Sequence, residues 1–340
     1  MTVEAGTRVN GTTIRRAVLD GEREGALPAE DLARVLEAIA RAASILTGEI
    51  RRAPFLGLLG LAGETNVTGD AQKKLDLAAN HVVLDAITDA GLIAAVISEE
   101  MDEERVLTEG PRARYVLAVD PLDGSSNTDV DGALGTIFGL YLPRSREVAP
   151  GARAPLPSGS DLVAAGYVLY GPGTLLVYAA GGRVRGFTLD PDTDTFLLTH
   201  PDIRCPARGS TYSANVGWQR AWHPNVRAFL DYLTASDPAT KRPYSLRYSG
   251  ALVADLHRSL VQGGLYIYPP DGRRPEGKLR LLYECAPLAF VTERAGGRAS
   301  TGTTRILEVR ATSPHQRSPL AIGSAEEVAL FERFLSTGGP

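Results

Sequence analysis

The sequence predicts a layered α/β (α+β) protein in which mixed and antiparallel sheets lie between helices. Residues 28–51 and 71–90 carry apolar residues at helical spacing, which indicates two amphipathic helices. Short apolar runs at 92–98 and 115–119 have the length of buried strands. Apolar runs divided by glycine and proline between 162 and 200 are typical of antiparallel strands. Helices and strands in this mixture bury their apolar faces as stacked layers.

Proline and glycine predict where these elements begin and end. The first helix should begin at Pro28, because proline is favoured in the first turn. The second should end at Gly91, and the glycine-rich residues 55–69 between the helices should form a mobile loop. The strand at 115–119 should stop before Pro121, because proline has no N–H to donate to a neighbouring strand.

The rest of the chain continues the alternation. An apolar run at 136–142 predicts another strand, and the Pro-, Gly- and Ser-rich residues 143–161 predict an exposed excursion. A tight polar loop is expected at 271–277. Four further helices, the last at the surface, are predicted at 222–232, 251–262, 279–295 and 326–335.

Composition argues against several classes of protein. The 340 residues are enough for one large core or two closely packed domains, and 44% hydrophobic with 22% charged residues is ordinary for a soluble protein. A formal net charge of -4 argues against nucleic acid as a partner, and no apolar run is long enough for a membrane span. The N-terminus lacks the apolar core of a signal peptide, and a chain with only Cys205 and Cys285 is most simply a reduced protein of the cytoplasm.

The most informative segment lies directly after the apolar run at 115–119. Asp120 and Asp123 offer carboxylates of the kind that hold hard divalent cations. Gly124, Ser125 and Ser126 follow, and their backbone N–H groups can bind a phosphate at the start of a helix. The segment therefore offers both halves of a metal-dependent phosphate site, although Asp-Pro and Asp-Gly on their own are common turn formers.

Other acidic residues also stand at the predicted ends of elements: Asp70 and Asp76, Glu99 and Glu100, and Glu284. Carboxylates gathered in one place repel one another unless metal ions neutralise them, so a cluster predicts Mg²⁺ or Mn²⁺. Taken singly, Glu99 and Glu100 are more often a solvated turn, and Glu284 is more often the partner of Arg280 in a helix salt bridge.

Cations and tyrosines gather in the C-terminal half, namely Arg247, Lys278 and Arg280 with Tyr248, Tyr266 and Tyr268. Arginine binds phosphate through a two-pronged fork, and tyrosine hydroxyls donate without adding charge. Together with a phosphate beside the metals, this set suits a substrate that carries two phosphates. A charged surface patch is the alternative.

Other catalytic classes find little support in the sequence. The five histidines include no His-x-x-x-His pair, and there is no Gly-x-Ser-x-Gly elbow. Neither a Gly-x-x-x-x-Gly-Lys-Ser/Thr loop nor a Gly-x-Gly-x-x-Gly loop occurs, which argues against a kinase or a dehydrogenase. His257 is expected to be a packed structural residue.

Taken together, the motifs resemble class I fructose-1,6-bisphosphatase, of the lithium-sensitive sugar phosphatase superfamily. The Asp-Pro-Leu-Asp-Gly core is common to the superfamily, and the Lys-Leu-Arg-Leu-Leu-Tyr-Glu block narrows the resemblance. The resemblance implies a five-layer α-β-α-β-α sandwich, with a metal- and 1-phosphate-binding half at 1–200 and a sugar- and 6-phosphate-binding half at 201–340. The matching blocks are residues 66–76, 98–100, 120–127, 135–139, 247–250, 277–284 and 315–317.

The implied reaction is Mg²⁺-dependent hydrolysis of fructose 1,6-bisphosphate to fructose 6-phosphate and phosphate, in gluconeogenesis or a carbon-fixation cycle. About two or three Mg²⁺ ions, with Mn²⁺ as an alternative, would be held by Glu99, Glu100, Asp120, Asp123, Glu284 and the carbonyl of Leu122. The 1-phosphate would lie on Gly124, Ser125 and Ser126, aided by Arg280, and Lys278 would contact the sugar or phosphate. The 6-phosphate would contact Asn215, Tyr248, Tyr268 and an Arg247 from a neighbouring subunit of a homotetramer. Asp76 and Glu100 would activate the water, joined by Asp70 when its loop closes.

Departures from the family pattern affect regulation and specificity. AMP-inhibited members carry Thr-Gly-Glu-Leu-Thr where this chain has Leu-Pro-Ala-Glu-Asp at 27–31, and their Lys-Tyr pair is Arg114-Tyr115 here. An expected arginine is Leu142, and these departures together predict weak or absent AMP inhibition. Trp218 stands where the 6-phosphate site usually has tyrosine, so a sedoheptulose-1,7-bisphosphatase, alone or as a dual activity, is the alternative. An inositol monophosphatase, a nucleotide 3′-phosphatase and a binding-only regulator are weaker candidates, because the carboxylates and the 278–284 block are all present.

Overall fold

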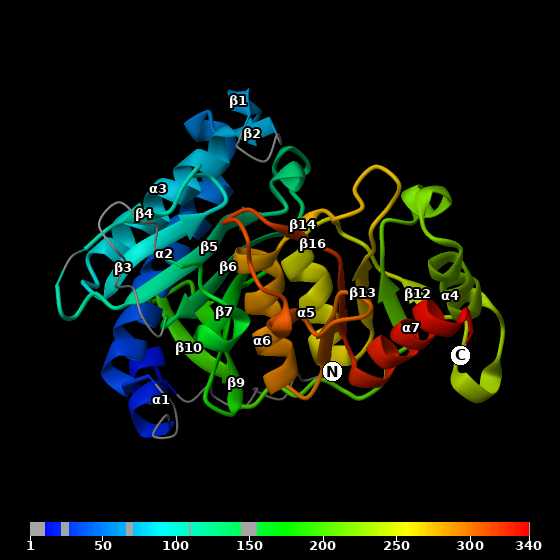
Figure 1. The fold of residues 1–340 in the computed structure, drawn as a ribbon. Helices are drawn as coiled ribbons and strands as arrows, with labels where there is room; N and C mark the ends of the chain where they lie inside the picture. Colours follow the sequence, from blue (N-terminus) through cyan, green and yellow to red (C-terminus); the bar gives the residue numbers. More distant parts are fainter. Residues whose placement is uncertain (1–10, 22–26, 66–70, 109, 144–154, 340) are drawn as a thin grey trace, which may run out of the picture.

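The computed structural model describes residues 11–21, 27–65, 71–108, 110–143 and 155–339. Within these residues the chain forms alternating layers of helices and sheets (Figure 1). The predicted layered α/β fold is therefore confirmed, and the order of the layers follows from the way each sheet is covered.

The larger sheet has eight strands in the order β10-β9-β8-β7-β6-β5-β3-β4. β3 and β5 run parallel to each other, and the other neighbouring pairs are antiparallel. The strands predicted at 92–98, at 136–142 and across 162–200 are confirmed. Their bounds are β3 (Ile93–Ser98), β4 (Arg105–Val106), β5 (Tyr115–Asp123), β6 (Leu134–Tyr141), β7 (Leu162–Tyr170), β8 (Thr174–Ala180), β9 (Arg183–Asp190) and β10 (Thr195–His200).

Helices cover both faces of this sheet because the side chains of each strand alternate in direction. Along β5, Leu117 and Val119 belong to one apolar core, whereas Val116 and Ala118 belong to a second core. The strand is buried throughout, as expected for a central strand between two helical layers. The helices are α1 (Ile14–Gly21), α2 (Ala29–Leu56) and α3 (Lys74–Thr88) on the first face, with α5 (Leu252–Gln262) and α6 (Ala286–Arg294) on the second.

The smaller sheet has five strands in the order β12-β11-β13-β17-β15 and packs on the far side of α5 and α6. Tyr266 shares a core with α5 and α6, and its neighbours Leu265 and Ile267 share a third core with α4 and α7. The layer order is therefore helix, sheet, helix, sheet, helix, as the resemblance implied. The bounds are β11 (Thr211–Ser213), β12 (Ser245–Leu246), β13 (Leu265–Tyr268), β15 (Arg298–Ser300), β17 (Leu320–Gly323), α4 (Pro224–Thr234) and α7 (Ala325–Thr337).

The four helices predicted in the second half are present as α4, α5, α6 and α7. The one predicted at 279–295 opens with β14 (Leu279–Arg280), which pairs with β16 (Arg317–Ser318), and with one π-helical turn, η5 (Leu281–Cys285). Residues 271–277 form a loop, as predicted. The last helix is more than a surface element, because Phe331 and Phe334 are buried against Phe229 of α4.

The connection between the first two long helices differs from the prediction. α2 follows Pro28 as expected but continues to Leu56, with Pro54 in its last turn. β1 (Leu61–Thr65) then pairs with β2 (Ala71–Lys73), so the loop predicted at 55–69 is partly helix and strand, and its residues 66–69 lie outside the described residues. α3 begins after residue 73 rather than at 71, because 71–73 are paired with β1, and it ends just before Gly91.

The prediction that a strand stops before Pro121 is wrong, since β5 continues to Asp123. The pairing of β5 with β6 shifts between Asp120 and Asp123, and such an irregularity tolerates a residue without an N–H group. The carbonyl of Pro121 accepts a hydrogen bond of 2.9 Å from the Thr136 hydroxyl, which in turn lies 2.9 Å from the hydroxyl of Tyr170. Tertiary hydrogen bonds thus carry the strand through the proline.

The exposed excursion predicted at 143–161 is described only in part, because residues 144–154 lie outside the described residues. Its last residues form η2, which leads directly into β7. The short helical turns are η1 (Ser125–Val130), η2 (Gly159–Asp161), η3 (Val216–Ala221), η4 (Pro238–Thr240) and η6 (Ile306–Glu308).

The division into halves at residue 200 stays a prediction. The larger sheet comes from residues 93–200 and the smaller sheet from residues 211–323, but α5 and α6 of the second half complete the core of the first sheet. In the described part of the chain, no helix combines the length and the apolar character needed to cross a bilayer.

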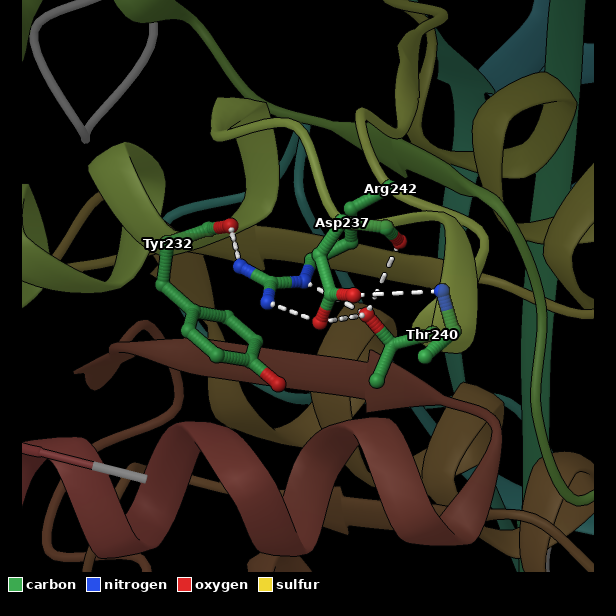
Figure 2. Close-up of polar contacts among 5 residues, drawn as sticks. Tyr232, Asp237, Thr240 and Arg242 are labelled. Carbon is green, nitrogen blue, oxygen red and sulfur yellow. Dashed lines mark hydrogen bonds and ion pairs between the residues drawn. The ribbon is translucent and has the colours of Figure 1, made fainter.

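The connection between α4 and β12 is held by one partly buried arginine. Figure 2 shows the guanidinium of Arg242 bonded to Asp237, Thr240 and the carbonyl of Tyr232, and the distances to the Asp237 and Thr240 oxygens are 2.7 and 2.8 Å. Arg242 also stacks 3.7 Å from the centre of the Tyr232 ring. These contacts fix the path of the chain into β12, which ends immediately before Arg247.

Candidate active site

A cavity of about 310 Å³ lies where β3 and β5 end. It draws on both halves of the chain, and most of its lining was predicted from the sequence. The lining residues are Lys73, Asp76, Glu99, Glu100, Asp120, Leu122, Asp123, Gly124, Ser125, Ser126, Tyr248, Gly250, Leu252, Tyr266, Tyr268, Lys278, Leu279, Arg280 and Glu284.

The parallel pairing of β3 with β5 brings two acidic pairs together. Ser98 is the register partner of Val119, and the N–H of Glu99 donates to the carbonyl of Val119 at 3.1 Å. Because parallel strands end at the same edge of a sheet, Glu99 and Glu100 leave β3 beside Asp120. Two acidic segments that lie about twenty residues apart in the sequence thereby line one wall.

Glu284 reaches the cavity from the second half of the chain. It lies in the π-helical turn η5, a local irregularity that is often found at functional sites, and only 4% of it is exposed. Its carboxylate accepts the backbone N–H of Arg280, and the Arg280 guanidinium lies 3.0 Å from Glu99. Arg280 therefore joins the two halves of the site, with its side chain directed to Glu99.

Burial raises the pKa of the acidic side chains in the cavity. The pKa of Asp76 rises to about 6, that of Glu100 to about 7 and that of Glu284 to about 8, with burial as the largest cause and the neighbouring Glu99 as a further one. The pKa of Asp123 rises to about 6 and the pKa of Asp120 rises well above its usual range, again chiefly through burial. The protein alone thus does not supply enough positive charge to stabilise all the carboxylates in their ionised form.

The residues present fit a hard divalent cation. Six carboxylate side chains line the cavity against three cationic ones, Lys73, Lys278 and Arg280, and a phosphate would add further negative charge. One oxygen of Asp76, Oδ1, is buried and has no hydrogen-bond partner among the described residues. Oxygen ligands of this kind suit Mg²⁺ or Mn²⁺.

The carboxylates nevertheless surround the cavity without converging on one point. As the described side chains stand, no three acidic, histidine or cysteine groups are close enough to hold an ion together. Protein donors hold several of them: Gln72 donates to Glu100, the N–H of Leu122 donates to Asp120 at 3.0 Å, and the N–H of Val253 donates to Asp123 at 2.8 Å. Small side-chain rotations would be needed to bring the oxygens onto a common ion.

Residues 124–127 directly after β5, which we call the phosphate-type loop because the sequence predicts that they bind phosphate, are tightly packed. Gly124 has a φ of +78°, and a Cβ there would lie 2.6 Å from the Cβ of Ala251, so both the backbone and the space require glycine. Ser125 begins η1, a 3₁₀ turn, where the sequence predicted the start of a helix. Gly124, Ser125 and Ser126 all line the cavity, as predicted.

The residues predicted to contact the sugar and the 6-phosphate divide into two groups. Tyr248, Tyr268 and Lys278 line the cavity, and the Lys278 Nζ lies 5.8 Å from the centre of the Tyr268 ring. Asn215 and Arg247 are not part of the lining. Asn215 hydrogen-bonds the side chain of Tyr248, whereas Arg247 follows the exposed β12 and donates to the carbonyl of the residue before it at 2.8 Å.

Sequence reasoning missed some residues, and one prediction cannot be placed. Asp70 lies outside the described residues. Lys73 lines the cavity and pairs with Asp129; its position among acidic residues near Asp76 was a signal that could have revealed it. Leu252 also lines the cavity but carries no chemical signal in the sequence.

Two side chains that the sequence singled out lie away from the cavity. His257 is packed, as expected, with its Nδ1 2.8 Å from the hydroxyl of Tyr167, and burial lowers its pKa to about 4. Trp218 is 43% exposed, and the Arg273 guanidinium stacks 3.7 Å from its ring centre. Neither residue is part of the cavity lining.

The region that departs from AMP-inhibited members is occupied by an internal ion pair. Asp31, in the first turn of α2, accepts hydrogen bonds from Arg114 at 2.8 Å and from the hydroxyl of Tyr115 at 2.7 Å. The carboxylate therefore takes up the two groups that match the family's Lys-Tyr pair.

Alternating layers with a carboxylate-lined cavity at the ends of two parallel strands form the sugar phosphatase arrangement that the resemblance implied. Two family models match nearly the whole chain: "Fructose-1-6-bisphosphatase, N-terminal domain" over residues 12–201 and "Fructose-1-6-bisphosphatase, C-terminal domain" over residues 205–336. The chain belongs to the fructose-1,6-bisphosphatase family.

Similar proteins agree with this assignment. The chain is 55% identical over 297 residues to "Fructose-1,6-bisphosphatase class 1 2" of Acaryochloris marina, which covers 87% of this chain and 89% of the relative. It is 46% identical to "Fructose-1,6-bisphosphatase class 1" of Chlorobium chlorochromatii, over 96% of this chain and 98% of the relative. Its structure is similar to the holo form of Leishmania major fructose-1,6-bisphosphatase, with a TM-score of 0.89 and 38% identity over 96% of this chain and 99% of that one.

Proposed function

We propose that this protein hydrolyses fructose 1,6-bisphosphate to fructose 6-phosphate and phosphate with the help of divalent metal ions. The observation that carries the proposal is one cavity that combines six carboxylates with Lys278, Arg280 and two tyrosines, Tyr248 and Tyr268. Family membership supports the substrate, since the relatives above are named for it. In this reaction water attacks the phosphorus of the 1-phosphate, the bond from phosphorus to the sugar oxygen breaks, and the sugar oxygen gains a proton.

The six carboxylate side chains that line the cavity, which we call the acidic wall, are the proposed metal site. Glu99, Glu100, Asp120, Asp123, Glu284 and the carbonyl of Leu122 would hold Mg²⁺, with Mn²⁺ as an alternative. Bound there, the metal would lower the pKa of the attacking water and stabilise the charge that develops on the transferred phosphoryl group and the leaving oxygen.

The remaining lining residues would bind the reacting phosphate and move its protons. Gly124, Ser125 and Ser126 would cradle the 1-phosphate, because they line the cavity next to Asp123. Arg280 and Lys278 would contact the phosphate or the sugar as cations. Asp76 and Glu100 would accept the proton of the attacking water, and the position of both in the acidic wall supports this role. Asp70 keeps its proposed role at loop closure, but it lies outside the described residues.

The distal phosphate would be held by Asn215, Tyr248 and Tyr268, with Arg247 supplied by a neighbouring subunit. The placement of Arg247 supports this arrangement, because it stands beside the exposed β12 and outside the lining of its own cavity. A homotetramer is the assembly that we propose. Two buried and free thiols, Cys205 and Cys285, are consistent with the proposed cytoplasmic location.

Phosphate release tests the proposal. Purified protein with Mg²⁺ should release phosphate from fructose 1,6-bisphosphate, and EDTA should abolish the release until Mg²⁺ is restored. Asp123→Ala should abolish turnover, while Asp85→Ala, which removes an exposed carboxylate from α3, should retain it. A near-normal rate in Asp123→Ala would refute the metal assignment.

A seven-carbon bisphosphate is the second candidate substrate. Trp218 replaces a tyrosine of the family's distal site and here stacks with Arg273 outside the cavity lining, so one expected hydroxyl contact is missing. Sedoheptulose 1,7-bisphosphate should therefore be assayed beside the fructose substrate, and the ratio of the two kcat/KM values measures how far the preference has moved.

A further inference from the structure

Residues 248–253 connect the two ends of the cavity, and we call them the spacer segment. The segment begins at Tyr248, which lines the cavity, and ends at Val253, whose N–H donates to Asp123. Gly250 and Leu252 also line the cavity. Any change in the course of this segment therefore changes the separation between Tyr248 and the acidic wall.

A buried carboxylate fixes the beginning of the spacer segment. Asp255, in the first turn of α5, is only 4% exposed. Its two oxygens lie 2.9 and 3.1 Å from the N–H of Ser249, the residue that follows Tyr248. A charged acceptor of this kind forms a stronger hydrogen bond than a neutral one, so Ser249 is tied firmly to α5.

An amide from the phosphate-type loop fixes the same residue from the other side. The Nδ2 of Asn127 donates to the carbonyl of Ser249 at 3.1 Å and to the carbonyl of Ala133 at 3.0 Å. Asn127 belongs to η1, which also carries Ser125 and Ser126. Both backbone groups of Ser249 are thus held, one by α5 and one by the loop that lines the reacting end of the cavity.

Close packing leaves the spacer segment little freedom to move. A Cβ on Gly124 would lie 2.6 Å from the Cβ of Ala251, and one on Gly135 would lie 2.5 Å from a methyl group of Val253. Gly250 has a φ of +85°, which few other residues adopt without strain. The segment therefore fits against β5, η1 and β6 without spare space.

We infer that Asn127 and Asp255 are positioning residues that set the distance between the metal side of the cavity and Tyr248. Neither is part of the cavity lining, so each acts through Ser249 rather than on the substrate. The inference rests on the proposed function, because it takes Tyr248 as a contact of the distal phosphate. It adds a specificity device: a rigid spacer matches the length of a sugar that carries phosphates at both ends.

The expected effect is a loss of substrate binding with little loss of the chemical step. Asn127→Ala should raise the KM for fructose 1,6-bisphosphate about tenfold, which is the order of one hydrogen bond to a charged group, and should change kcat less than about twofold. Asp255→Ala should do the same, and Asp255→Asn should recover most of the loss because it keeps one acceptor oxygen for Ser249. Asn225→Ala is the matched control, since Asn225 donates a similar amide hydrogen bond of 3.0 Å to the carbonyl of Leu335, away from the cavity.

A double-mutant cycle with Tyr248→Phe distinguishes positioning from general destabilisation. If Asn127 acts through Tyr248, the kcat/KM of the double variant should fall no further than that of the worse single variant. Effects that multiply would overturn the inference, and so would an unchanged KM in Asn127→Ala or an equal rise in Asn225→Ala. Asn127→Ala is the main test, because Asn127 is only partly buried and its replacement disturbs the fold less than replacement of the buried Asp255. Failure of the proposed function would be visible separately, as absent Mg²⁺-dependent turnover in the unmodified protein.

Discussion

The hydroxyl of Thr136 should contribute strongly to the free energy of unfolding, because it supports the irregular end of β5. Thr136 is buried, donates to the carbonyl of Pro121 and lies 2.9 Å from the hydroxyl of Tyr170. Because the single hydrogen of the Thr136 hydroxyl is donated to Pro121, the Tyr170 hydroxyl donates to Thr136. Thr136→Val keeps the shape of the side chain but removes both hydrogen bonds.

The magnitude follows from the two groups that lose a partner. The Pro121 carbonyl and the Tyr170 hydroxyl would both be left buried and unpaired, at about 1–3 kcal/mol each, so the free energy of unfolding should fall by about 2–6 kcal/mol. Thr136→Ser is the control, because it keeps the hydroxyl and loses only a methyl group, at about 1 kcal/mol.

Urea unfolding at neutral pH measures the difference between the two variants. The Mg²⁺ concentration for half-maximal activity gives a second readout, which should rise several-fold in Thr136→Val because Pro121 stands between Asp120 and Asp123. If Thr136→Val is as stable as Thr136→Ser, the hydroxyl does not support this end of the strand and the reasoning fails.

Three further predictions concern regulation, pH and assembly. AMP should inhibit weakly, because Asp31 already occupies Arg114, and half-inhibition at micromolar AMP would contradict this. His257 has a pKa of about 4 against an ordinary 6.5, so between these pH values the unfolded chain binds more protons than the folded protein. The free energy of unfolding should therefore fall as the pH drops from 6.5 toward 4, by at most about 3 kcal/mol. Urea unfolding across this range should show that fall relative to His257→Gln, and parallel curves would exclude it. Arg247→Ala should raise KM more than it lowers kcat. When Arg247→Ala subunits are mixed with inactive Asp123→Ala subunits, the mixed oligomers should contain sites of normal KM. If mixing leaves the raised KM unchanged, Arg247 does not act across subunits.

The sequence predicted the acidic wall of the cavity well because its chemistry is local. Asp120, Asp123, Glu99 and Glu100 stand at the ends of apolar runs, and two parallel strands that end together must bring such residues close. Hydrophobic periodicity likewise located the helices and most strands. The layer order came from the resemblance, and the way both faces of β5 are buried bears it out.

The misplaced end of β5 and the missed supporting residues depend on contacts that no local pattern reveals. Pro121 was expected to end its strand, but Thr136 supplies a hydrogen bond from the neighbouring strand. Asn127 supports Ser249, a residue 122 positions away, and Asp255 owes its importance to burial rather than to its neighbours in sequence. Such pairs are set by tertiary packing, and a single sequence carries no signal of them.

The middle helical layer has a consequence for how this protein can change over evolutionary time. α6 is buried at seven consecutive residues, from Ala286 to Thr292, so it has no face on which a polar substitution would be neutral. Insertions, tags and new binding surfaces must therefore accumulate in the outer layers, around α1, α4 and α7. The centre of the molecule should drift only through paired, volume-conserving exchanges with the sheets on its two sides.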